Sequence, residues 1–118
     1  MALTNAVQEG LVGLLLFDDS GMVVRATIPA RLFDRYYREL AQAADGYWQR
    51  YGRPPGEHAV DLIEELAGQR PDDAKVYRRL CKSLYDSRAG LNATYLLDQA
   101  RAFVRHQTLR EAIVKAAE

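Results

Sequence analysis

The segment 92–118 constrains the fold of this chain more than any other part of its sequence. It contains neither glycine nor proline, and it opens with Asn92, a residue type that favours the capping position before a helix. Helices usually end at a glycine or shortly before a proline, and neither follows here. The pattern predicts one long helix. We expect the chain to be the front part of a longer protein, divided within or just after this helix; the alternative is a natural last helix that runs to the terminus.

The rest of the chain shows the same helical signal in shorter pieces. Apolar residues recur at helical spacing, and turn residues such as the GRPPG of 52–56 separate the pieces. The sequence therefore predicts the all-α fold class, a compact bundle of about five helices that ends in a long C-terminal helix. We expect a globular domain over 1–91 and, over 92–118, a long helix that continues toward a further part of the protein. The shorter predicted helices cover 5–17, 31–51, 57–67 and 74–86.

The segment 22–28 is ambiguous. Val23, Val24 and Ile28 are residue types typical of a strand. No second strand is predicted to pair with it, and an isolated strand would leave its backbone donors without partners. We therefore expect an irregular segment or a short helical turn.

The predicted helix over 31–51 has the clearest division into an apolar and a polar face. Large aromatic side chains recur along its apolar face, and each can bury on the order of 150–250 Å². We expect this aromatic stripe to form the core of the domain. Its members are Phe33, Tyr36, Tyr37, Leu40, Ala44, Tyr47, Trp48 and Tyr51.

Composition restricts the classes of function. The chain has 118 residues, enough for one domain with one core. Its 16 Lys and Arg balance its 16 Asp and Glu, so no overall field attracts nucleic acid or an anionic membrane. Cys81 is the single cysteine, which excludes an internal disulfide and fits a cytoplasmic setting. The longest apolar run, 11–17, is too short to span a bilayer.

Signatures of catalysis are missing. The sequence has no G-x-x-x-x-G-K-[ST] phosphate loop, no G-x-G-x-x-G and no H-E-x-x-H. His58 and His106 are the only histidines and fall on different predicted helices, whereas zinc chemistry requires three or four ligands at defined spacing. No catalytic, cofactor-binding or metal-ligating residue is predicted in this chain.

Two rows of like charge occupy the predicted helices 57–67 and 74–86. Residues spaced three, four and seven apart share one helix face, and like charges there repel by roughly a few tenths of a kcal/mol per pair. Such rows suggest opposite charges nearby, from a neighbouring helix, another subunit or phosphates; the alternative is a solvated face. We predict partner-binding surfaces, and for protein partners in preference to DNA. The acidic row is Glu57, Asp61, Glu64 and Glu65, and the basic row is Lys75, Arg78, Arg79 and Lys82.

The long last helix carries two apolar faces. The first, in its N-terminal half, can pack on a small domain, but the second points elsewhere and needs another partner. We predict that the second, called here the distal face, is an oligomer interface; the alternative is a frayed terminal helix. The first face is Leu96, Leu97, Ala100, Phe103 and Val104, and the distal face is Leu109, Ala112, Ile113 and Ala116.

Several of these segments resemble, in order, the N-terminal domain of DnaB-type replicative DNA helicases. The VQEGLVGLLL of 7–16, followed by Asp18, is similar to that domain's opening E-x-x-V-L-G-x-L-L-L-D helix. The VDLIEEL of 60–66 is similar to its V-T-L-A-E-x-L segment. Its long final helix has the pattern Y-x-x-x-V-R-E-x-x-x-x-R-x-x-I-x-A-A. The further positions that match are Phe33, 37–40 and Pro55 and, in the last helix, Tyr95, Val104, Arg105, Arg110, Ile113, Ala116 and Ala117.

One stretch departs from the family. The V-G-G-x-x-Y-L segment and the N-T-P-S-A-A-N loop before the long helix are replaced here by RPDDAKVYRRLCKSLYDSRAGLN over 70–92. The departure indicates a divergent member, from a phage or a mobile element, and it leaves open which partners the domain binds.

The resemblance implies a non-catalytic assembly and docking domain. In this family the N-terminal domains pair as dimers through a helical hairpin, and the long last helix of this chain resembles the first arm of that hairpin. The paired domains build a collar on the hexameric ring and bind primase or a helicase loader. ATP, Mg²⁺ and most DNA contacts belong to a separate C-terminal domain, so this chain itself is expected to hold no cofactor and to contact no membrane. The alternative is a stand-alone helical protein-interaction module, such as a small phage or regulatory protein. A nucleic-acid binder that uses the basic row is a third class.

Overall fold

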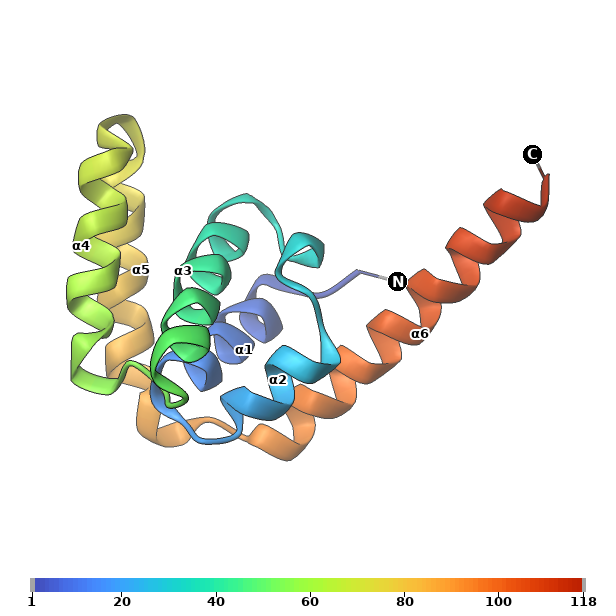
Figure 1. The fold of residues 1–118 in the computed structure, drawn as a ribbon, viewed down its shortest axis with the longest axis horizontal. Coiled ribbons are helices and arrows are strands. Elements are labelled where there is room, and N and C mark those ends of the chain that lie inside the picture. The colour runs from blue at the N-terminus through green and yellow to red at the C-terminus, as the bar shows by residue number, and fades with distance from the viewer. Residues whose placement is uncertain (1, 118) are drawn as a thin grey trace.

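The computed structural model describes residues 2–117, which form six α-helices joined by short turns, with no strand in this range (Figure 1). The predicted all-α class and the long C-terminal helix are confirmed. Short 3₁₀ turns precede α3, α4, α5 and α6. The helices are α1 (Asn5–Phe17), α2 (Gly21–Thr27), α3 (Arg35–Tyr51), α4 (Ala59–Gln69), α5 (Ala74–Ser87) and α6 (Ala93–Ala117).

Two helix starts follow from capping side chains. The backbone N–H of Val7 donates to Oγ1 of Thr4 at 3.2 Å, at the start of α1. The backbone N–H of Tyr95 donates to Oδ1 of Asn92 at 3.1 Å, at the start of α6. Each cap gives a partner to a donor that the first helical turn leaves free, and both predicted starts are therefore confirmed.

The helix α2 is the element that the sequence did not clearly indicate. It spans Gly21–Thr27, so the short helical turn expected as one of two alternatives for 22–28 is confirmed, and the irregular segment is not found. Val24 is fully buried. Gly21 lies so close to α1 that a Cβ atom there would sit 2.7 Å from the carbonyl oxygen of Leu14. Packing against α1 therefore outweighs the local preference, as it does for most short helices.

The centre of the core is α1, which contacts α2, α3, α5 and α6. The aromatic stripe of α3 is only partly core, so that expectation was too broad. Phe33 and Trp48 are buried, but Tyr47 is half-buried and Tyr51 is 55% exposed. The reason is that α3 turns one side toward α1 and another toward α4, where the tyrosine hydroxyl groups keep contact with water.

The two halves of α6 differ in their surroundings. The first half packs on α1 and α2, with Leu96 and Phe103 in the core. Its close approach depends on Gly10 of α1, where a Cβ atom would lie 2.6 Å from the side chain of Leu96. The second half projects away from the body (Figure 1). Within residues 2–117, no helix is long and apolar enough to cross a membrane.

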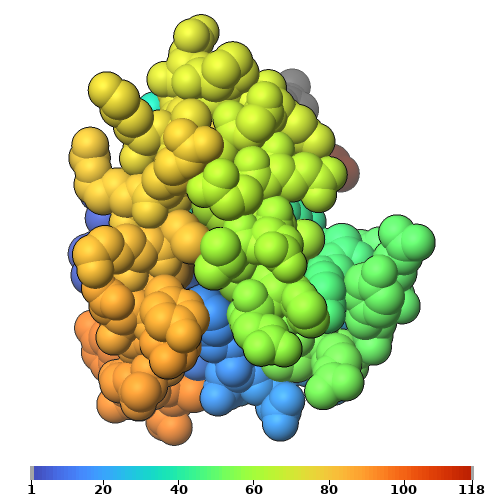
Figure 2. Space-filling view, turned by 90° about the vertical axis from the view of Figure 1, so that its left-hand side faces the viewer, coloured from blue at the N-terminus to red at the C-terminus, as the bar shows by residue number. Residues whose placement is uncertain are grey.

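On the opposite side of the molecule, α4 and α5 form a hairpin (Figure 1). The two helices lie side by side over that face, with the end of α3 next to α4 (Figure 2). Ile63 of α4 and Tyr77 and Leu84 of α5 are buried beneath them. The hairpin and the projecting half of α6 are thus the two ends of the long axis.

Candidate interaction surfaces

The projecting half of α6 exposes large apolar side chains. Every residue over 108–117 is exposed, and Leu109 and Ile113 of the distal face are each 61% exposed. Val114, which is not part of the predicted distal face, is also 55% exposed. Val114 lies on another side of the helix, in line with Phe103, so the apolar surface of the projecting half is wider than one stripe.

Such a helix end is poorly stable by itself. A helical segment of this length without tertiary contacts is marginal in water, since most helical stability in proteins comes from packing. Contiguous exposed apolar side chains also mark sites of interaction on folded proteins. The projecting half of α6 is therefore suited to docking against another protein surface.

The acidic row divides between two sides of α4. Glu64 faces α5, where Nε of Arg78 donates to its Oε1 at 3.1 Å. This hydrogen bond and the Glu64 charge raise the pKa of the Arg78 guanidinium. Asp61 and Glu65 lie on the side of α4 that faces α3. Of the eight residues in the two rows, the structure brings only Glu64 and Arg78 into contact with each other.

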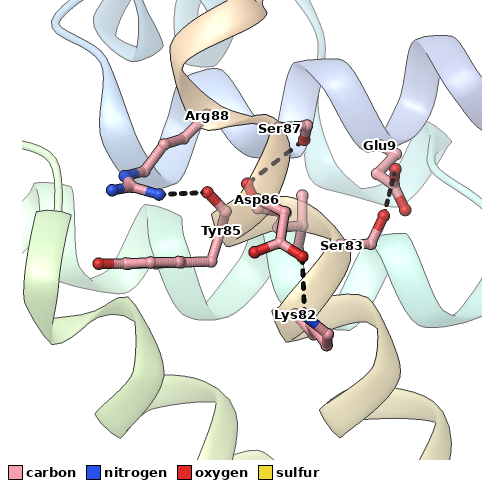
Figure 3. Close-up of polar contacts among 8 residues, drawn as sticks. Glu9, Lys82, Ser83, Tyr85, Asp86, Ser87 and Arg88 are labelled. Carbon is pink, nitrogen blue, oxygen red and sulfur yellow. Dashed lines mark hydrogen bonds and ion pairs between the residues drawn. The ribbon is translucent and has the colours of Figure 1, made fainter.

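The basic row is partly neutralised within the chain. Nζ of Lys82 donates to Oδ2 of Asp86 at 2.9 Å, one turn further along α5 (Figure 3). With Arg78 held by Glu64, the remaining cations of the row are Lys75 and Arg79, which form no ion pair within residues 2–117. Two exposed cations are too few for tight binding of a nucleic acid, because affinity grows with the number of phosphates that a protein neutralises.

We therefore expect the chain to bind single-stranded DNA no more tightly than about 1 µM at physiological salt. A fluorescence anisotropy titration with a labelled oligonucleotide measures this affinity. Tighter binding that is lost in the variant Lys75→Glu/Arg79→Glu would show that the basic row contacts DNA. The variant Arg31→Glu/Arg53→Glu, at exposed positions outside the row, is the control for net charge.

A groove runs between α3 and α4, with a volume of about 700 Å³. The rings of Tyr47 and Tyr51 line the α3 side with their centroids 4.5 Å apart, and the carboxylates of Asp61 and Glu65 line the α4 side. In the sequence, Tyr47 and Tyr51 belong to the predicted core stripe, and Asp61 and Glu65 belong to the acidic row. The groove could not be predicted from the sequence, because it exists only once α3 and α4 are packed next to each other.

The chain's histidines and its cysteine are not arranged as a catalytic group. Nδ1 of His58 lies 3.4 Å from Oδ2 of Asp61 on the exposed rim of the groove, and His106 is on α6. Burial and the Glu64 charge raise the pKa of the Cys81 thiol, so it stays protonated at neutral pH and is a poor nucleophile. Within residues 2–117, no group of three His, Cys, Asp or Glu side chains is placed to hold a metal ion.

Comparison with known proteins adds no family. No family model, curated protein or solved structure matches this chain. The resemblance to the DnaB-type N-terminal domain therefore depends only on residues of α1, α3, α4 and α6 and of the turns between them.

Proposed function

We propose that this chain is a non-catalytic assembly and docking domain of a hexameric replicative DNA helicase. In this role it supports the collar of the ring and binds primase or a helicase loader in the cytoplasm. ATP hydrolysis, Mg²⁺ and most DNA contacts would belong to a separate C-terminal domain of that helicase. The proposal depends chiefly on one observation, the exposed apolar side chains on the projecting half of α6.

The energetics of this element favour association. Fully burying a Leu or Ile side chain is worth about 1.5–3 kcal/mol. Leu109 and Ile113 together offer several kcal/mol, from which the several kcal/mol lost on ordering two bodies must be subtracted. The balance corresponds to a weak contact between isolated domains. In a ring the same contact would repeat between subunits. Because the subunits would already be held together by their other domains, the effective concentration of each surface would rise and the contact would be stronger than between isolated domains.

The positions that carry the family resemblance support the helicase assignment over a general interaction module. They lie on α1, on α3 and the turn before it, and on α4 and the turn before it, and they extend along α6 from Tyr95 to Ala117. The stretch that departs from the family, 70–92, covers α5 and the turns on either side of it. A divergent α5 fits a docking surface that binds a different primase or loader from the one that other members of the family bind.

The first test is self-association. We expect the parent chain to form a dimer with a dissociation constant on the order of micromolar or weaker, and the variant Leu109→Asp/Ile113→Asp to be monomeric. Both side chains are mostly exposed, so the variant should keep its fold. Sedimentation velocity over a wide concentration range measures the association, and far-UV circular dichroism measures the helical content.

The matched control lies at the start of α6, away from the distal face. This variant, Thr94→Asp/Tyr95→Asp, adds the same two negative charges to exposed positions and should leave association unchanged. A parent chain that stays monomeric at every concentration would contradict the proposal. An unfolded Leu109→Asp/Ile113→Asp variant would show that the distal face supports the core.

A further inference from the structure

The groove between α3 and α4 has carboxylates without strong cationic partners. Glu65 forms no ion pair within residues 2–117. In the same range, the only basic side chain within ion-pair distance of the Asp61 carboxylate is the imidazole of His58. On the opposite wall, the guanidinium of Arg50 lies over the ring of Tyr51, 5.6 Å from its centroid. The groove thus offers two carboxylates along the α4 wall, and aromatic surface with the single cation Arg50 along the α3 wall.

Apolar side chains also line the groove between these walls. Leu62 and Leu66 of α4 and Ala43 of α3 contribute to its lining, and Leu66 is largely buried there. An apolar groove with carboxylates on its rim fits a helix that presents an apolar stripe flanked by basic residues. The volume of about 700 Å³ is enough for several side chains of such a stripe, although not for a whole helix.

The projecting half of α6 has this pattern. Arg105 precedes Leu109 by four positions and Arg110 precedes Ile113 by three, so each arginine lies beside the distal face. Over 105–117 the helix carries two arginines and Lys115 against the single acidic residue Glu111. None of these three cations forms an ion pair within residues 2–117. Basic and apolar groups are therefore available together on one exposed helix.

The projecting half of α6 cannot reach the groove of its own molecule. The α3–α4 side and the end of α6 lie at opposite ends of the longest dimension, which is 45 Å (Figure 1). The first half of α6 is fixed in the core, so the helix cannot fold back without unfolding. Any contact between the two surfaces must join different copies.

A direct pairing of two distal faces is electrostatically less favourable. It would bring the Arg105 and Arg110 side chains of both copies to the same interface, where like charges repel. Docking into the groove instead places these arginines near Asp61 and Glu65. Charge complementarity of this kind selects the partner and the orientation of an interface.

From this complementarity we infer that the projecting half of α6 of one copy docks into the α3–α4 groove of a second copy. The contact is head-to-tail, and repetition of such a contact closes a ring or extends a chain of molecules. The inference deepens the proposed function, since it names the surface that receives the distal face. The inference rests on the proposed function, because that function is what makes the projecting half of α6 an association surface.

A complementation experiment tests the head-to-tail contact. The groove variant is Asp61→Lys/Glu65→Lys, and the tail variant is Leu109→Asp/Ile113→Asp; all four positions are exposed, so both should fold. We expect each variant alone to associate about tenfold or more weakly than the parent. An equimolar mixture should form a one-to-one complex, because it joins the intact tail of the groove variant to the intact groove of the tail variant. Sedimentation velocity with one variant fluorescently labelled measures this complex.

The outcomes separate this inference from the function on which it rests. If the groove variant associates as tightly as the parent while the tail variant is monomeric, distal faces pair with each other; the inference is then wrong and the proposed function stands. If the mixture of variants stays monomeric although both are folded by circular dichroism, the two surfaces do not meet. A parent that never associates overturns both. The variant Asp72→Lys/Asp98→Lys, at exposed positions that neither line the groove nor belong to the acidic row, is the control for charge and should associate like the parent.

Discussion

Replacing Trp48 with alanine is expected to destabilise the domain by about 3–5 kcal/mol, the usual cost of removing a large aromatic side chain from a core. Trp48 is only 2% exposed, and its Nε1–H donates to the carbonyl oxygen of Leu15 at 2.8 Å. The ring therefore joins α3 to the end of α1 and also contacts the start of α2 at Gly21. Domains of this size have a total stability of about 5–15 kcal/mol, so the loss is a large part of it.

The measurement is urea denaturation followed by circular dichroism, since the substitution removes the chain's single tryptophan and with it the fluorescence signal. The control Trp48→Phe keeps most of the apolar bulk and removes the N–H donor. It should cost about 1–3 kcal/mol, because the carbonyl of Leu15 is left without this partner. Equal losses for both substitutions would mean that the hydrogen bond, and not the ring, holds the three helices together.

Features that depend on near neighbours in the sequence were predictable. The caps at Thr4 and Asn92 each use a side chain within three residues of its backbone partner, and the helices that follow them begin where the helices over 5–17 and 92–118 were predicted to begin. The same holds for the apolar spacing along α1 and along the first half of α6. Leu96 and Phe103 are buried as that spacing predicts.

Features that depend on how the helices are arranged were not predictable from the pattern. The helix α2 forms from strand-type residues because α1 and Trp48 leave room for a helix with glycine at position 21. Tyr51 carries an aromatic ring at a core spacing, yet it is exposed because it lies in the last turn of α3, where it lines the open groove toward α4. The acidic row is a single pattern in the sequence, but its members have different surroundings in the structure. Glu64 forms an ion pair with Arg78 of α5, whereas Asp61 and Glu65 line the groove between α3 and α4.

The close contact between α1 and α2 gives the second large effect. Gly21→Ala is expected to destabilise the domain by about 1–3 kcal/mol or more, the range for overpacking in a well-filled core. The added Cβ would lie 2.7 Å from the carbonyl oxygen of Leu14, 2.9 Å from Cα of Leu15 and 2.9 Å from the ring of Trp48. Two of these neighbours are backbone atoms of α1, so relief requires the central helix of the core to shift.

Gly46→Ala is the matched control, because it makes the same chemical change where there is space. Gly46 is exposed within α3, and a Cβ there meets no heavy atom within 4 Å. Replacing a glycine with alanine in an open helix interior should instead stabilise the domain by up to about 1 kcal/mol. Urea denaturation followed by Trp48 fluorescence measures both variants. If Gly21→Ala were as stable as Gly46→Ala, α2 would lie farther from α1 than described, and Trp48 could not bridge α1, α2 and α3 as it does here.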